Sequence, residues 1–214
     1  MIFAKQKELP NCPRKIIQFA VNDWLHSINC VKANSTKIQV EFAWVHPRIG
    51  AFKLNADCTC KPSSRAIGVR GVIRDSVGDW VGGFSVNLGT SQILEAELWG
   101  LFFGLQLAVA HGISNLVIEM DSALVVHLMK NPDTIGGHPL AGMLASCWDF
   151  MNLLRDCDLH HVYREWNCLA DCLANGSYNL DLGVCWFDSV PLWAEAALVN
   201  DRIGVSRPCL VPVV

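Results

Sequence analysis

The succession of extended and helical segments between residues 52 and 175 constrains the fold more than any other feature of this sequence. Three short runs rich in β-formers come first, and a Ser-Val-Gly-Asp sequence typical of a hairpin turn separates the second from the third. Helical and extended patterns alternate after them. The predicted strands are 52–57, 68–75, 80–88, 116–120 and 159–164, and the predicted helices are 92–110, 123–130, 140–154 and 166–175.

These segments predict a mixed sheet, because hairpins require antiparallel neighbours whereas alternating strands and helices require parallel crossovers. We therefore expect an α/β fold of order βββαβαβα, with a five-stranded sheet and covering helices. The helix at 92–110 is apolar on nearly every side and must be buried. Ser91 is expected to cap its start and Gly112 to end it, while Ser122 is expected to cap the helix at 123–130.

Charge and patterning divide the chain into three parts. Residues 1–49 hold seven Lys and Arg against three Asp and Glu, and are predicted to form a basic arm with a short amphipathic helix at 16–28 and a linker. Residues 50–178 are expected to form the α/β domain, which is rich in acidic residues. Residues 179–214 are expected to form a C-terminal tail.

Composition argues against several classes of protein. The formal net charge of −3 gives no sign of nucleic-acid binding through bulk electrostatics, and 51% hydrophobic residues suffice for one sizeable core. The ten cysteines lack the two paired Cys-x-x-Cys knuckles of a zinc site, which favours free thiols in a reducing compartment. Charges interrupt the N-terminus, and the apolar stretch at 98–110 is shorter than the roughly 20 residues of a membrane span. We expect an intracellular protein, nuclear or cytoplasmic and not secreted, with no membrane partner.

Four acidic residues stand in apolar surroundings, within the segments LNADCT, EAELWGL, VIEMDSALVV and NCLADCLAN. They are Asp57, Glu97, Asp121 and Asp171. Buried acids are costly unless they are paired or bind a metal. Mg²⁺ takes oxygen ligands, and a two-metal site holds its ions roughly 3.5–4 Å apart to hydrolyse a phosphodiester. Convergence of the four acids on such a site would explain all of them together.

The alternative is that these acids are unrelated. Asp121 and Asp171 each lie near a helix start, where the helix dipole favours an anion. Glu97 has no such explanation, because it lies within an apolar helix. Glu119 shares a strand face with Asp121 by alternation, and is either a supporting acid or an edge charge, so we leave it out of the site.

Several motifs in order resemble the type-1 RNase H family, and more narrowly the plant RNase H-like domains of non-LTR retrotransposon polyproteins. They are FKLNADC, GVRGVIRDSVGDW, EAELWGLFFGL, VIEMDSALVV and HVYREWNCLADCLA, and the resemblance covers about residues 52–177. It implies an RNase H-like fold, with metal ligands at Asp57, Glu97, Asp121 and Asp171. It also implies endonucleolytic cleavage of the RNA strand of RNA/DNA hybrids with Mg²⁺ or Mn²⁺. We expect the protein to act as a monomer.

The sequence departs from this family at two places. Cys58 follows Asp57, where the family commonly has glycine, and the histidine that many members carry before the last helix is absent. Arg164 and Asn167 match the branch that lacks this histidine. They either bind substrate phosphate, orient Asp171 or are surface residues. Two other functions therefore stay open: a catalytically silent transposon-derived module that binds nucleic acid, and a domain that binds protein partners through the helix at 16–28.

Overall fold

The computed structural model describes residues 37–60, 66–162, 169, 170, 173 and 181–212. The strands are β1 (Lys37–Phe42), β2 (Phe52–Cys60), β3 (Ala66–Arg74), β4 (Trp80–Thr90), β5 (Asn115–Met120), β6 (Asp156–His161), β7 (Gly183–Phe187) and β8 (Arg207–Pro212). The helices are α2 (Ile93–Ala110), α3 (Ala123–Lys130), the short η1 (Pro132–Thr134), α4 (Ala141–Leu153) and α6 (Leu192–Arg202). The predicted helix at 16–28 lies outside the described residues.

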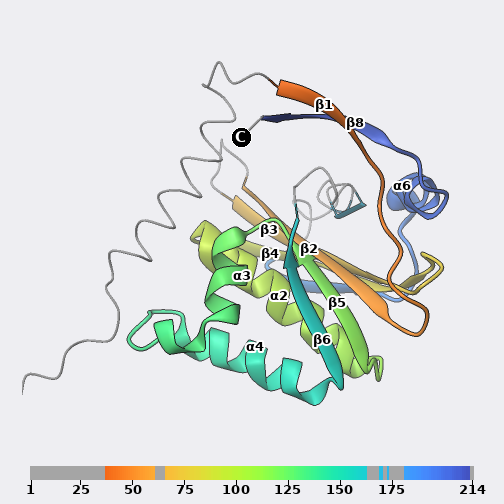
Figure 1. Ribbon diagram of the computed structural model, residues 1–214. Coiled ribbons are helices and arrows are strands. Elements are labelled where there is room, and N and C mark those ends of the chain that lie inside the picture. The colour runs from red at the N-terminus through yellow and green to blue at the C-terminus, as the bar shows by residue number, and fades with distance from the viewer. Residues whose placement is uncertain (1–36, 61–65, 163–168, 171–172, 174–180, 213–214) are drawn as a thin grey trace, which may run out of the picture.

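A six-stranded mixed sheet in the order β6-β5-β2-β3-β4-β7 forms the centre of the fold (Figure 1). β2, β3 and β4 are consecutive antiparallel neighbours, whereas β5 and β6 run parallel to β2. This arrangement confirms the predicted α/β class and the five predicted strands. The sixth strand, β7, was not predicted, because it comes from the segment that we expected to be a tail.

The hairpin between β3 and β4 closes where the sequence predicted it. Asp75 and Asp79 are joined by a backbone hydrogen bond, and Gly78 has a φ of +83°, a conformation that L side chains rarely adopt. A β-carbon on Gly78 would also lie 3.2 Å from the Trp44 ring. The turn therefore requires glycine for both its backbone and its surroundings.

α2 packs across one face of the sheet, and half of the helix is buried. Gly104 allows its close approach, because a β-carbon there would lie 2.3 Å from Leu54 Cδ2 on β2. By length and composition α2 is long and apolar enough to cross a membrane, a property that buried core helices also have. α2 ends at Ala110, and Gly112, with a φ of +66°, follows its C-cap His111 and terminates the helix as predicted. The predicted Ser91 cap is wrong, because Gln92 precedes the helix and the Ser91 hydroxyl donates to Glu95.

The C-terminal residues cover the opposite face of the sheet. Leu169 and Leu173 pack with Val72 of β3 and with Ala194 and Ala197 of α6. β8 pairs with β1 in a separate two-stranded antiparallel sheet beside α6 (Figure 1). Residues beyond 178 thus contribute a strand and a covering helix, although the domain boundary at 178 stays a prediction.

Candidate metal centre

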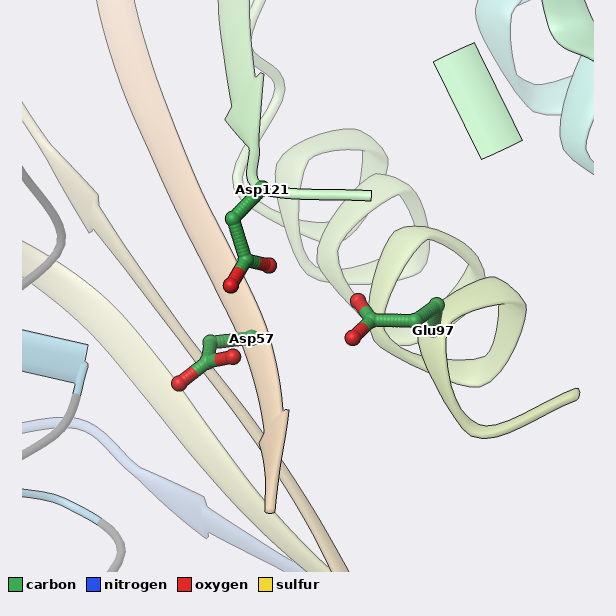
Figure 2. Close-up of side chains that lie close together, drawn as sticks. All are labelled: Asp57, Glu97 and Asp121. Carbon is green, nitrogen blue, oxygen red and sulfur yellow. The ribbon is translucent and has the colours of Figure 1, made fainter. Parts of the chain in front are cut away.

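Three of the four predicted acids come together where the N-terminal part of the buried helix α2 meets β2 and the end of β5. Asp57 lies on β2, Asp121 follows the last residue of β5, and Glu97 lies in α2 (Figure 2). One ligand oxygen from each lies within 4.8 Å of the other two. Asp171, the fourth predicted ligand, lies outside the described residues.

Local structure explains why these three side chains meet. β2 and β5 are parallel neighbours, and Ala56 pairs with Met120 in their register. An aspartate follows each of these two residues, Asp57 within β2 and Asp121 directly after β5, so the two carboxylates lie at the same level of the sheet. Glu97 projects from α2 toward the two strands, as Figure 2 shows.

Burial makes this cluster electrostatically costly in the absence of a cation. Glu97 is only 7% exposed, and its burial, followed by the charges of Asp121 and Asp57, raises the pKa of its carboxyl well above the usual range. Its Oε2 atom is buried without a hydrogen-bond partner among the described residues. A divalent cation would offset both the repulsion and the missing hydrogen bond, so the residues present fit a metal site.

Cys58 supports Glu97 from the neighbouring strand position. Its Sγ donates a hydrogen bond of 2.9 Å to Glu97 Oε1, and burial raises the pKa of the thiol above its ordinary value, with Glu97 adding to the effect. The thiol therefore stays protonated and remains a donor. Cys58 belongs to the core cluster beneath α2, so the side chain that replaces the family's glycine is accommodated in the protein interior.

Arg70 of β3 is the closest charged neighbour that the sequence analysis missed. It pairs with Asp57 in the β2–β3 register, and its Nη2 lies 2.5 Å from Asp57 Oδ2. Both residues are 1% exposed. The sequence shows Arg70 on a predicted strand, but only the register places it opposite Asp57.

Of the other residues that the sequence analysis considered, some have structural roles and others lie outside the described residues. Glu119 pairs with Lys53 Nζ at 2.5 Å and accepts from Asn55, and is not among the three clustered acids. Ser122 caps α3 as predicted, by accepting from the Val125 amide. The predicted substrate-binding residues Arg164 and Asn167 lie outside the described residues.

His161 lies beside the cluster, although the sequence analysis gave it no role. Its Nε2 is 3.2 Å from the main-chain oxygen of Asp121. The imidazole contacts the backbone that carries one of the acids, and this contact helps to fix the end of β5.

Comparison with known proteins agrees with this architecture. The chain matches the reverse transcriptase-like family over residues 55–177. It is 33% identical over 209 residues to the Arabidopsis thaliana "Putative ribonuclease H protein", which covers 97% of this chain. The chain spans only about a third of that relative, 34% of its length.

Solved RNase H domains share the fold. The N-terminal RNase H domain of a Mycobacterium tuberculosis protein is 26% identical with a TM-score of 0.55, covering 59% of this chain and 92% of that one. RNase H1 of Halobacterium salinarum is 21% identical with a TM-score of 0.52, covering 60% and 98% of the two chains. The compost-derived LC11-RNase H1, solved with an RNA/DNA hybrid, is 20% identical with a TM-score of 0.50, covering 56% and 91%.

The family match covers more than half of the chain and includes all three clustered acids. The solved RNase H domains match 56–60% of the chain with TM-scores of 0.50 to 0.55. The chain therefore belongs to the reverse transcriptase-like family, whose domain here has the RNase H fold.

Proposed function

We propose that this protein hydrolyses the RNA strand of RNA/DNA hybrids by a metal-dependent endonucleolytic reaction. The observation that carries the proposal is the convergence of Asp57, Glu97 and Asp121, with a buried Glu97 oxygen that lacks a donor among the described residues. The name of the Arabidopsis relative and the hybrid bound to LC11-RNase H1 support the same substrate class.

The three clustered acids and Asp171 are the proposed ligands for Mg²⁺ or Mn²⁺, since carboxylate oxygens suit both ions. When bound, such ions activate a water molecule and stabilise the leaving oxygen of a phosphodiester. The protein side chains hold this arrangement: Cys58 orients Glu97 by its hydrogen bond, and Arg70 holds Asp57 in place. Arg164 and Asn167 are proposed to hold a backbone phosphate of the substrate.

Recognition of the hybrid is proposed to depend on duplex shape and the RNA 2′-hydroxyl, with no reading of base sequence. The acidic cluster repels phosphate, so affinity is expected to be modest and to fall steeply with salt. The basic segment at 1–49 is proposed to contribute backbone contacts, with the protein acting as a monomer inside the cell, in the nucleus or the cytoplasm.

Cleavage of a labelled RNA/DNA hybrid by the Asp57→Asn and Asp121→Asn variants tests this proposal. Each variant loses a charged metal ligand, while asparagine keeps the shape of the side chain. We therefore expect activity to fall by more than the roughly 10- to 100-fold loss typical of residues that only hydrogen-bond to a metal ligand. Asp149→Asn is the control, because Asp149 is an exposed acid on α4 and should leave cleavage unchanged. Equal rates for all four proteins would refute the assigned site.

A second candidate function is a catalytically silent module, derived from a retrotransposon, that binds nucleic acid. The buried Arg70–Asp57 ion pair favours it, because Asp57 already has a counter-ion before any metal binds. Binding of the hybrid without cleavage, by a folded chain given Mg²⁺ or Mn²⁺, would support this function over hydrolysis. A role in binding protein partners through residues 16–28 concerns a segment outside the described residues.

A further inference from the structure

We propose that Arg70 is a built-in counter-ion of the acidic cluster, which positions Asp57 and lowers the affinity of the site for divalent cations. This inference rests on the proposed function, because it requires that the cluster bind a metal ion. It adds a residue that regulates the occupancy of the site and is not itself a metal ligand.

The strand register holds Arg70 at the site. Residue 57 of β2 and residue 70 of β3 are direct antiparallel partners, so their side chains project from the same face of the sheet. Arg70 pairs in turn with Ser85 of β4, which is also buried. With strands on both sides and 1% exposure, the guanidinium has no route to solvent without a local opening of the fold.

The charge of this guanidinium is permanent, since arginine does not lose its proton in proteins. Its Nη2 engages Asp57 Oδ2 at 2.5 Å, so a cation that uses this oxygen must compete with the ion pair. A divalent ion elsewhere in the cluster still experiences repulsion from a positive charge a few ångströms away. Both effects weaken metal binding, while the same ion pair stabilises the cluster when no metal is present.

Arg74 provides a matched control within the same strand. It lies four residues after Arg70, so it is on the same face of β3, and it is also 1% exposed. Its Nη1 pairs with Asp201 Oδ2 of α6 at 2.8 Å, and neither residue belongs to the acidic cluster. Removal of either arginine breaks a buried ion pair, but only removal of Arg70 changes the charge at the proposed metal site.

Calorimetric titration of the full chain with Mn²⁺ tests the inference, with wild type, Arg70→Leu, Arg70→Lys and Arg74→Leu compared. We expect both leucine variants to lower the melting temperature measured without metal. Arg70→Leu should bind Mn²⁺ on the order of 10- to 100-fold more tightly than wild type, because the change removes a positive charge that repels the cation from a few ångströms away. Arg74→Leu should retain wild-type affinity, and Arg70→Lys, which keeps the charge, should stay close to wild type.

Two outcomes would overturn the inference. Equal Mn²⁺ affinity for Arg70→Leu and Arg74→Leu would overturn the role of Arg70 while leaving the metal site intact. Absence of Mn²⁺ binding in every protein, with Arg70→Leu included, would overturn the inference together with the metal-dependent function. If Arg70→Leu fails to fold, Arg70→Gln replaces it, since glutamine keeps a donor for Asp57 and removes only the charge.

Discussion

At the scale of single residues, burial was the property that made the candidate site predictable. Glu97 could be selected from the sequence because an acid inside an apolar helix has no ordinary structural explanation. Cys58 and Arg70 could not be assigned in this way. Their contacts with Glu97 and Asp57 depend on strand register and helix packing, which one-dimensional patterns do not specify.

The raised pKa of Glu97 predicts how stability depends on pH without metal. A carboxyl whose pKa is higher in the folded than in the unfolded protein stabilises the fold below its ordinary pKa of 4.5. This stabilisation is lost as the pH rises through the raised value. The free energy of unfolding should therefore fall as the pH rises from 4.5 to the raised pKa of Glu97. Glu97→Gln should remove the contribution of Glu97 to this fall, because glutamine does not ionise.

Urea unfolding in the presence of a chelator, at a series of pH values from about 4 upward, measures this dependence. Mg²⁺ should restore stability to the wild type at the higher pH values, because it binds only the deprotonated carboxylate. Identical pH profiles for wild type and Glu97→Gln would show that Glu97 has the same pKa in the folded and unfolded protein.

At the scale of secondary-structure elements, pattern predicted most of the strands and helices. The long apolar run of α2, followed by alternating strand and helix patterns, is compatible with few other arrangements of secondary structure. β7 was missed because it has only five residues and pairs with β4, almost a hundred positions earlier in the chain. The Ser91 cap was wrong because the hydroxyl bonds to the Glu95 side chain and α2 begins two residues later.

Replacement by alanine should have opposite effects on stability at two helical glycines, because one contacts the sheet closely and the other does not. Gly104→Ala should destabilise the fold by about 1–3 kcal/mol, because the added carbon would overlap the Leu54 side chain. Gly142→Ala in α4 meets no atom within 4 Å and should stabilise by about 0.4–1 kcal/mol. Denaturant midpoints give both values, and a neutral Gly104→Ala would contradict the close packing of α2 on the sheet.

At the scale of the whole molecule, the C-terminal residues complete the fold. Trp44, which precedes β2, stacks against the Arg74 guanidinium, whose carbon lies 3.8 Å from the ring centroid. Arg74 also donates to Asn55 and pairs with Asp201 of α6. This buried network joins α6 to the middle of the sheet. The predicted domain boundary at residue 178 instead assigned these two parts to a domain and a separate tail.

A chain shortened to residues 1–178 should be markedly less stable than the full protein. It lacks β7, α6 and β8, so Val72, Leu169 and Leu173 lose their packing against Ala194 and Ala197, and Arg74 loses its counter-ion Asp201. In Asp201→Asn, by contrast, Arg74 stays buried without a counter-ion, a change that costs about 3–5 kcal/mol. Thermal unfolding of the shortened and full chains makes the comparison, with Asp201→Asn as the control for the ion pair alone. Equal melting temperatures would instead confirm an independent domain that ends at 178.

The most direct test of the central claim is strand-resolved cleavage by the wild-type chain. An RNA/DNA hybrid with a different label on each strand is incubated with Mg²⁺, with Mn²⁺ and with a chelator. The acidic cluster predicts internal cuts in the RNA strand with a metal ion, none with the chelator, and an intact DNA strand in every case. A folded protein that leaves the RNA intact with both ions would contradict hydrolysis and favour the silent module.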